Sequence, residues 1–282
     1  MKAGFLWVWE KVGRFFNGLV PTVCLLCGRG LRGELVCPDC ELGLPHLSLT
    51  EGSCRQCAVP LPQESSGDYC GHCLAKPPAF SCTVVPFRYQ YPVDYLIHHF
   101  KYRRQLAAGR ALGQALAQCV LHTYDEQDRC LPELIIPVPL HWTRRWLRGF
   151  NQTDLLGRQL ATELKLPLAS RACRRTRHTP AQKGLSRAKR QENLRQVFSM
   201  TAAGNRAIQG KRVALLDDVV TTTATTRELS HLLIRQGAKE VHVWALARTP
   251  DVRPINTPQD QEATTASRSV LRSKRASSFH IS

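Results

Sequence analysis

The sequence is poor in acidic residues. It contains 22 Asp and Glu against 39 Lys and Arg, which gives a net charge of +17 and a pI near 9.7. So large an excess of positive charge calls for an anionic partner such as phosphate groups, nucleic acid or a membrane surface. The charge is also uneven. Residues 141–195 hold 14 Lys and Arg and three acids, so 11 of the 17 excess charges lie in these 55 residues.

A membrane-spanning apolar run is missing as well. The N-terminal stretch MKAGFLWVWEKVGRFFNGLV is interrupted by Glu10, Lys11 and Arg14, and no small-residue cleavage site follows it, which argues against secretion. Its apolar residues recur at helical spacing, so residues 1–22 are predicted to form an amphipathic helix packed on the protein's own body. Contact with a membrane surface or a partner is the alternative. We expect the protein in the cytoplasm.

Cysteine, by contrast, is plentiful. Eight of the 12 cysteines form four Cys-x-x-Cys pairs within 50 residues: Cys24 and Cys27, Cys37 and Cys40, Cys54 and Cys57, Cys70 and Cys73. Each pair can give two thiolates to one tetrahedral ion. With no β-α-β pattern around them, the pairs indicate metal sites rather than a redox motif. We predict two structural Zn²⁺ ions in a double zinc ribbon at residues 23–76, with sequential pairing of the motifs or, alternatively, a cross-braced arrangement.

Strand-like and helix-like segments alternate from Ser81 onward. The predicted strands are residues 82–89, 134–139, 213–218 and 241–247, and the predicted helices are residues 95–121, 152–164 and 225–236. This alternation predicts an α/β domain at residues 81–250 with a mainly parallel sheet flanked by helices. Residues 251–282 contain too few apolar side chains to pack and are predicted to form a disordered basic tail.

Two adjacent carboxylates end one of the predicted buried strands. Asp217 and Asp218 lie in the stretch VALLDDVVTTTATT, whose threonine-rich loop leads into a helix N-terminus. The free N–H groups and the dipole of a helix N-terminus favour a phosphate, and threonine hydroxyls add donors. Since two carboxylates would repel a phosphate directly beside them, a ribose diol that donates to both fits between. The pattern therefore predicts a ribose 5-phosphate site; an acidic turn and a capped helix without a ligand is the alternative.

The same stretch resembles the ribose-phosphate motif of type I phosphoribosyltransferases. Together with the cysteine ribbon and RGFNQ at residues 148–152, it makes the chain from about Cys24 to Arg248 similar to the ComF/GntX family of competence-associated proteins. The resemblance implies a phosphoribosyltransferase-like (Rossmann-like) domain, a role in DNA uptake during natural transformation, and DNA-uptake proteins as partners. It also implies phosphoribosyl pyrophosphate with Mg²⁺ as the ligand, Asp217 and Asp218 as catalytic carboxylates, and a phosphate loop made of Thr221, Thr222, Thr223, Ala224 and Thr225.

Two basic segments extend this picture. By the resemblance, Arg144, Arg145 and Arg148 lie in the pyrophosphate-binding loop, where guanidinium groups match phosphate oxygens. The segment RRTRHTPAQKGLSRAKRQENL corresponds to a mobile loop that closes over the substrate. Its charge makes it an equally good contact for single-stranded DNA. The candidate nucleic-acid residues are Arg174, Arg175, Arg177, Lys183, Arg187 and Arg190.

One position departs from the family pattern. Thr223 stands where the family usually has glycine, and glycine allows a positive φ that is difficult for a β-branched residue. We expect either another loop conformation or a weaker affinity for phosphate. The sequence thus supports two functions. One is a phosphoribosyltransferase with an acceptor that the sequence does not name, and the other is a non-catalytic protein that binds a ribose phosphate and single-stranded DNA.

Overall fold

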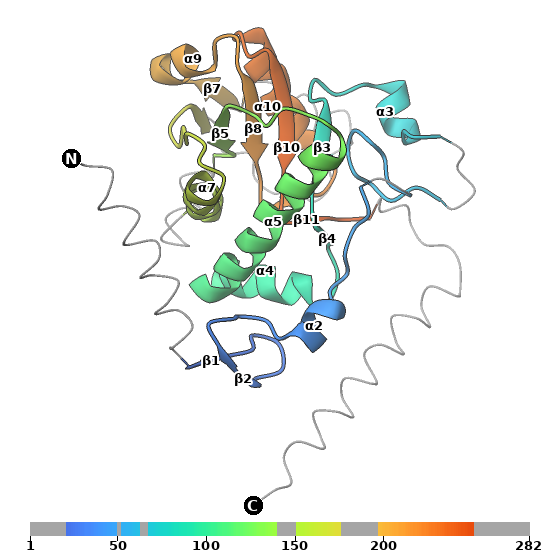
Figure 1. The fold of residues 1–282 in the computed structure, drawn as a ribbon. Helices are drawn as coiled ribbons and strands as arrows, with labels where there is room; N and C mark the ends of the chain where they lie inside the picture. Colours follow the sequence, from blue (N-terminus) through green and yellow to red (C-terminus); the bar gives the residue numbers. More distant parts are fainter. Residues whose placement is uncertain (1–20, 50–51, 63–66, 140–150, 176–196, 251–282) are drawn as a thin grey trace, which may run out of the picture. The chain divides into compact units, whose positions relative to one another are not determined.

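The computed structural model describes residues 21–49, 52–62, 67–139, 151–175 and 197–250 (Figure 1). The predicted N-terminal helix up to residue 20 and the predicted tail at residues 251–282 lie outside these ranges. Residues 21 and 22 belong to a short strand instead of that helix. Within the described ranges, no helix combines the length and the apolar character needed to cross a membrane.

The core of the structure is a four-stranded parallel sheet with the order β3-β10-β8-β5. Its strands are β3 (Cys82–Val84), β5 (Leu134–Pro137), β8 (Arg212–Leu216) and β10 (Glu240–Trp244). Almost every residue in them is buried, and β5 and β8 accordingly read as nearly continuous apolar runs. The α/β class predicted from the sequence is confirmed.

Three of these strands continue, after an interruption of two residues, into a second parallel sheet. This sheet consists of β4 (Phe87–Arg88), β11 (Ala247–Arg248) and β9 (Val219–Val220). The interruption between β8 and β9 is the pair Asp217–Asp218. The Asp217 N–H donates to the carbonyl of Trp244 at 2.9 Å, and the Leu246 N–H donates to the carbonyl of Asp218 at 3.1 Å. The strands predicted at residues 82–89 and 241–247 therefore each cover parts of two short strands, and the strand predicted at residues 213–218 ends in the acidic pair at such a break.

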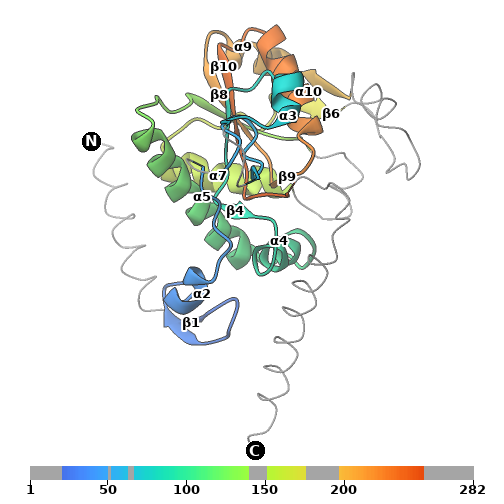
Figure 2. The same ribbon diagram turned by 90° about the vertical axis from the view of Figure 1, so that its right-hand side faces the viewer.

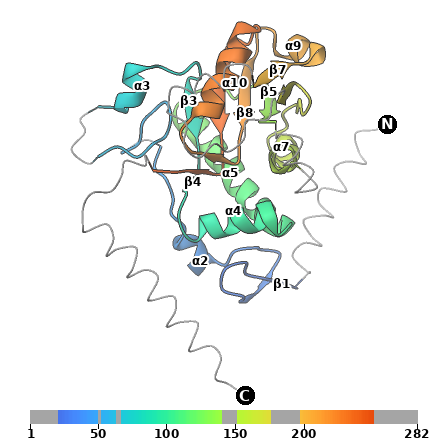
Figure 3. The ribbon, with the colours of Figure 1, turned by 180° about the vertical axis from the view of Figure 1, so that it is seen from behind.

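Helices cover both faces of the main sheet. They are α4 (Val93–Tyr102), α5 (Leu106–Glu126) and α7 (Gln152–Glu163) on one face, and α9 (Ala202–Ile208) and α10 (Ala224–Arg235) on the other. Figure 1 shows α5 in front of the sheet, and Figure 3 shows α10 on the opposite face. The single helix predicted at residues 95–121 is wrong. The chain breaks between α4 and α5, where Arg104 adopts a φ of 54°.

The two zinc ribbons are built from short elements. They are β1 (Pro21–Val23), which pairs antiparallel with β2 (Gly30–Arg32), and the helices α2 (Pro38–Leu42) and α3 (Gly71–Ala75). Figures 1 and 2 show α2 and α3, one from each ribbon, well separated on the sheet domain. A further antiparallel pair, β6 (Cys173–Arg175) with β7 (Phe198–Met200), was not predicted, because three residues are too few for a recognisable period.

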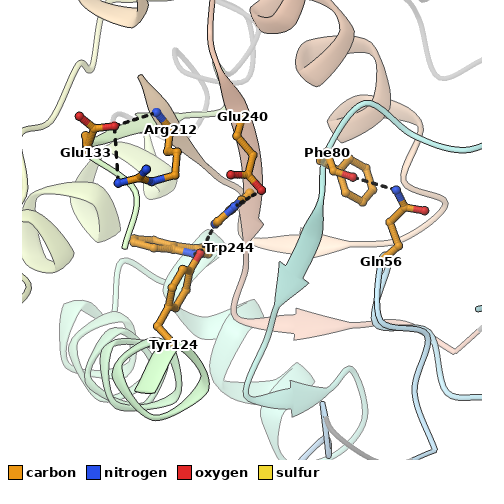
Figure 4. Close-up of polar contacts among 8 residues, drawn as sticks. Gln56, Phe80, Tyr124, Glu133, Arg212, Glu240 and Trp244 are labelled. Carbon is orange, nitrogen blue, oxygen red and sulfur yellow. Dashed lines mark hydrogen bonds and ion pairs between the residues drawn. The ribbon is translucent and has the colours of Figure 1, made fainter. Parts of the chain in front are cut away.

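Polar contacts tie the second ribbon and helix α5 to the sheet (Figure 4). The Gln56 side chain donates to the carbonyl of Phe80 at 3.0 Å, and the Thr83 hydroxyl donates to the carbonyl of Gln56 at 2.8 Å. On the α5 side, the hydroxyl of Tyr124 is hydrogen-bonded to Nδ1 of the buried His242. Burial lowers the pKa of His242, which favours the neutral form of the ring. The second ribbon is thus hydrogen-bonded directly to edge strand β3.

Candidate functional site

The eight paired cysteines form two separate clusters. Within each cluster the four sulfur atoms lie within 4.8 Å of one another. The first cluster is Cys24, Cys27, Cys37 and Cys40, and the second is Cys54, Cys57, Cys70 and Cys73. The pairing of the motifs is therefore sequential and not cross-braced.

The spacing of the sulfur atoms fits zinc. Sγ of Cys27 lies 3.7 Å from Sγ of Cys37, and Sγ of Cys57 lies 3.6 Å from Sγ of Cys70. Tetrahedral zinc with bonds of about 2.3 Å places its sulfur ligands about 3.8 Å apart. A disulfide would bring them to about 2.05 Å. Because each cluster offers four sulfur ligands and leaves no position for a substrate, both are structural sites.

Local sequence explains how each ribbon presents its sulfur atoms. Helices α2 and α3 begin directly after Cys37 and Cys70, so the second cysteine of each of these pairs lies in a first helical turn. Pro38 at the first helical position suits this start, because its missing N–H would have no partner there. The other two pairs close with a residue of positive φ, Gly28 at 76° and Ala58 at 54°. Each of these residues donates its N–H back to the first cysteine's carbonyl.

The two aspartates lie at the carboxyl edge of the main sheet. Asp217 Oδ1 accepts the N–H of Asp218 at 2.8 Å. Burial, reinforced by the charge of Asp218, raises the pKa of Asp217 to about 7. The pair therefore resists carrying two negative charges near neutral pH.

A lysine neutralises the second carboxylate. Nζ of Lys101, in the last turn of α4, lies 2.9 Å from Oδ1 of Asp218, and both side chains are only 15% exposed. The buried Gln152, at the start of α7, donates from Nε2 to the carbonyl of Lys101 at 3.2 Å. The last residue of the RGFNQ segment thus supports the turn that carries the lysine. The structure brings α4, α7 and the acidic pair together at one place.

The threonine-rich loop contains the backbone conformation that glycine would supply. Thr223 has φ 58° and ψ 2°, and it is 4% exposed. A left-handed conformation costs an L-residue roughly 1–2 kcal/mol. Its hydroxyl donates to the carbonyl of Thr222 at 2.6 Å and accepts from Nε of Arg227 at 3.0 Å. These contacts hold the strained residue, so the first of the two expected alternatives, a loop without the positive φ, does not occur, and the weaker affinity for phosphate stays a prediction.

Helix α10 begins with an uncapped N-terminus. Thr223 is the N-cap residue but makes no side-chain cap, because its hydroxyl is engaged elsewhere. The first N–H groups of a helix have no partner within the helix itself. Thr221 and Thr222 are exposed beside them, while Thr225 is half-buried. An uncapped helix N-terminus thus follows the acidic pair by a few residues, and a phosphate-binding role of this loop stays a prediction.

The predicted basic residues fall into two groups. Arg174 and Arg175 lie on β6, where Arg174 is exposed and the guanidinium of Arg175 lies 5.6 Å from the centre of the Phe198 ring. Only Arg174 of these two has the exposure expected of a nucleic-acid contact. The others lie outside the described residues, and their roles stay predictions: Arg144, Arg145, Arg148, Arg177, Lys183, Arg187 and Arg190.

Sequence reasoning missed three cations around the site: Lys101, Arg227 and Arg248. Lys101 follows Ile97 by four residues, so a helical projection places it at the border of the buried face of α4. Arg227 lies in the first turn of α10, where the helix dipole disfavours a cation. Arg248 ends a buried strand and is itself 4% exposed. Each is a cation at a position where the sequence pattern predicts burial or an unfavourable helix dipole. A search of the sequence for such cations could have found all three.

Comparison with known proteins now identifies the family. Residues 15–74 match the family model of the double zinc ribbon domain. The chain is 39% identical over 231 residues to competence protein F of Haemophilus influenzae, an alignment that covers 80% of this chain and 96% of the relative. It is 36% identical to the DNA utilization protein YhgH of Escherichia coli K12, over 80% of this chain and 90% of the relative. The chain belongs to the competence protein F family.

Two solved structures are similar in fold to about half of this chain. Glutamine phosphoribosylpyrophosphate amidotransferase from B. subtilis matches 53% of this chain and 30% of its own at 19% identity, with a TM-score of 0.35. A hypoxanthine phosphoribosyl transferase from Trypanosoma cruzi matches 53% of this chain and 69% of its own at 17% identity, with a TM-score of 0.34.

Substitution of Thr223 separates the backbone strain from the contacts of the hydroxyl. Thr223→Gly relieves the strain but loses the hydrogen bonds, so we expect the free energy of unfolding to stay within about 1 kcal/mol of wild type. Thr223→Val keeps the shape and the strain and leaves Nε of Arg227 without its partner, which should cost about 1–3 kcal/mol. Chemical denaturation measures both, and a valine variant as stable as wild type would contradict the role given to the hydroxyl.

The raised pKa of Asp217 predicts a pH-dependent effect of Asp217→Asn. This group takes up a proton near pH 7 in the folded chain and near 3.8 in the reference state. Its contribution to stability is thus present below about pH 4 and is lost as the pH rises through 7. The variant should match wild type near pH 4 and exceed it above pH 7 by about 1–3 kcal/mol in thermal or chemical unfolding.

The control for this pH profile is Asp68→Asn, which changes an exposed carboxylate in the second ribbon. Its difference from wild type should not vary with pH in the same way. A stability gain of Asp217→Asn that is equal at pH 4 and pH 8 would contradict the shift of Asp217.

Proposed function

We propose that this member of the competence protein F family binds a phosphoribosyl ligand, phosphoribosyl pyrophosphate with Mg²⁺, at the edge of the main sheet. The observation that carries the proposal is the position of Asp217 and Asp218 at a strand end that leads, through the short strand β9 and three threonines, to the uncapped N-terminus of α10. The carboxylates would accept the two ribose hydroxyls. The N–H groups and the Thr221 and Thr222 hydroxyls would hold the 5-phosphate.

Lys101 gives this site a charge balance that suits such a ligand. Without a ligand, the lysine pairs with Asp218, and the raised pKa keeps part of the negative charge off Asp217. A diol donates to both carboxylates without adding negative charge, whereas a phosphate in the same place would be repelled. Mg²⁺ bound with the ligand would supply positive charge next to the diphosphate and favour ionised carboxylates.

Handling of DNA is the second part of the proposal. The relatives are named as a competence protein and as DNA utilization proteins, and the chain carries 11 excess positive charges in residues 141–195. We propose that these residues bind single-stranded DNA, with the exposed Arg174 of β6 at the border of the surface. The four-cysteine zinc sites are typical of reducing conditions, which favours the cytoplasm as the compartment.

Phosphoribosyl transfer is a second candidate, and the conformation of Thr223 favours it. Because this residue keeps a positive φ, the threonine does not by itself remove the loop geometry on which turnover would depend. In such a reaction, the bond between ribose C1 and the diphosphate breaks, an acceptor forms a new bond to C1, and diphosphate leaves. Asp217 and Asp218 would orient the ribose through the positively charged transition state.

Titration calorimetry with phosphoribosyl pyrophosphate and Mg²⁺ tests the ligand. We expect wild type to bind and the double variant Asp217→Asn, Asp218→Asn to lose on the order of a hundredfold or more in affinity. The reason is that hydrogen bonds to charged acceptors contribute roughly 1.5–3 kcal/mol each. Asp68→Asn should bind as wild type does. Failure of both wild type and Thr223→Gly to bind would remove the phosphoribosyl ligand and leave DNA binding as the function.

Salt dependence tests the DNA surface. Binding of a labelled single strand should weaken steeply as salt rises, since each neutralised phosphate releases counterions. Replacing Arg174, Arg177 and Lys183 by Gln should flatten the slope by roughly the number of lost phosphate contacts, about 0.7 each. Arg235→Gln, at the far end of α10, is the matched control and should keep the slope. An unchanged slope in the triple variant would place the DNA site elsewhere, most simply on the ribbons.

A further inference from the structure

Two arginines connect the second zinc cluster to the threonine-rich loop. Arg248, at the end of β11, is 4% exposed. Its Nε donates to the carbonyl of Cys57 at 2.9 Å. On the other side, its Nη1 donates to the carbonyls of Val220 at 3.2 Å and Thr221 at 2.5 Å. One guanidinium thus joins the backbone of a zinc-ligating residue to the backbone at the start of the loop.

Arg227, in the first turn of α10, makes a second connection between the same zinc cluster and the loop. Its Nε donates to the hydroxyl of Thr223 at 3.0 Å, the contact that holds the left-handed residue. Its Nη2 donates to Sγ of Cys73 at 3.6 Å, and its Nη1 donates to the carbonyl of Lys76. The side chain therefore reaches from the loop to a sulfur atom of the zinc cluster itself.

The charges explain why a cation tolerates this position. Four thiolates around Zn²⁺ carry a net charge of −2, and a hydrogen bond from a guanidinium to a thiolate is charge-assisted. This attraction offsets the unfavourable dipole at the N-terminus of α10. Zinc would also hold the sulfur atom of Cys73 in place for this contact. Loss of zinc would thus weaken the contact at Cys73 and, through Arg227, the support of Thr223.

The first zinc cluster has no such connection. Among the residues that the structure describes, its cysteines make no hydrogen bond to residues 219–227. A nearby guanidinium, that of Arg29, instead pairs with Asp39 within the same ribbon. The two metal sites have the same ligand set, but within the described ranges only the second is hydrogen-bonded to the arginines that hold the loop.

We propose that the second zinc site holds the loop at residues 219–223 in its ligand-binding conformation, with Arg227 and Arg248 as positioning residues. The functional part of this inference rests on the proposed phosphoribosyl site, whereas the coupling between zinc and loop can be measured without any ligand. Residues that orient the ligands of a metal typically change its affinity by 10–100-fold. The coupling should therefore change both the zinc affinity of the second site and the hydrogen exchange of the loop.

Zinc transfer to a chromogenic chelator tests the metal end. Wild type should release two zinc ions per chain. Arg227→Ala should release one of them 10–100-fold more readily and leave the other unchanged, so that the first site is an internal control. Arg227→Lys keeps a charge near Cys73 and should recover part of the affinity, whereas Arg235→Ala should behave as wild type. Equal zinc affinity in wild type, Arg227→Ala and Arg248→Ala would overturn the proposal.

Hydrogen exchange in the full chain tests the loop end. Removal of the second zinc by Cys54→Ser should speed the exchange of amides in residues 219–226, and removal of the first by Cys24→Ser should not. If Cys54→Ser unfolds more than its own ribbon, Arg248→Ala gives the same test with both zinc sites intact. Unchanged exchange in Arg227→Ala and Arg248→Ala would overturn the coupling. Faster exchange in a protein that binds no phosphoribosyl pyrophosphate would support the coupling and reject the proposed ligand.

Discussion

The structure of the site depends on the pair of carboxylates at the break between β8 and β9. Two adjacent aspartates at the end of a buried strand are unfavourable unless their charge is balanced, and the fold supplies one balancing cation from α4. That cation can reach Asp218 only if the last turn of α4 lies beside the carboxyl edge of the sheet. Gln152 of α7 hydrogen-bonds the same turn. The packing of α4 and α7 against the sheet therefore also determines the charge balance of the aspartate pair.

Strand pairing before and after the break restricts the backbone on both sides of the carboxylates. β8 pairs with two neighbours before the break, and β9 pairs with β11 after it. The backbone of the pair is hydrogen-bonded to β10 and to the residues that follow it. A ligand that uses these carboxylates would meet side chains on an ordered backbone and would lose little affinity to loop ordering.

The parts of this architecture that could be predicted from the sequence are those with a local chemical signature. Four Cys-x-x-Cys pairs predicted two zinc sites, and the carboxylates before a threonine-rich loop were placed correctly at a strand end. Contacts between distant segments left no such signature. Lys101 precedes its partner Asp218 by more than a hundred residues, and neither segment contains a pattern that predicts the ion pair between them. The left-handed conformation of Thr223 was also missed, because it depends on a hydrogen bond to Arg227 rather than on intrinsic preference.

The hydrogen bond between Arg248 and the carbonyl of Cys57 spans 191 residues of sequence, and this separation bears on the order in which the chain folds. The second ribbon needs only the 20 residues from Cys54 to Cys73 to bind zinc, so it can fold early in synthesis, when metal binding alone stabilises it. The loop cannot be fixed until strand β11, close to the end of the sheet domain, has been made. In a growing chain, the second zinc site is complete long before the loop that it supports. The last strand in the described part of the chain is thus the one whose arginine connects ribbon and loop.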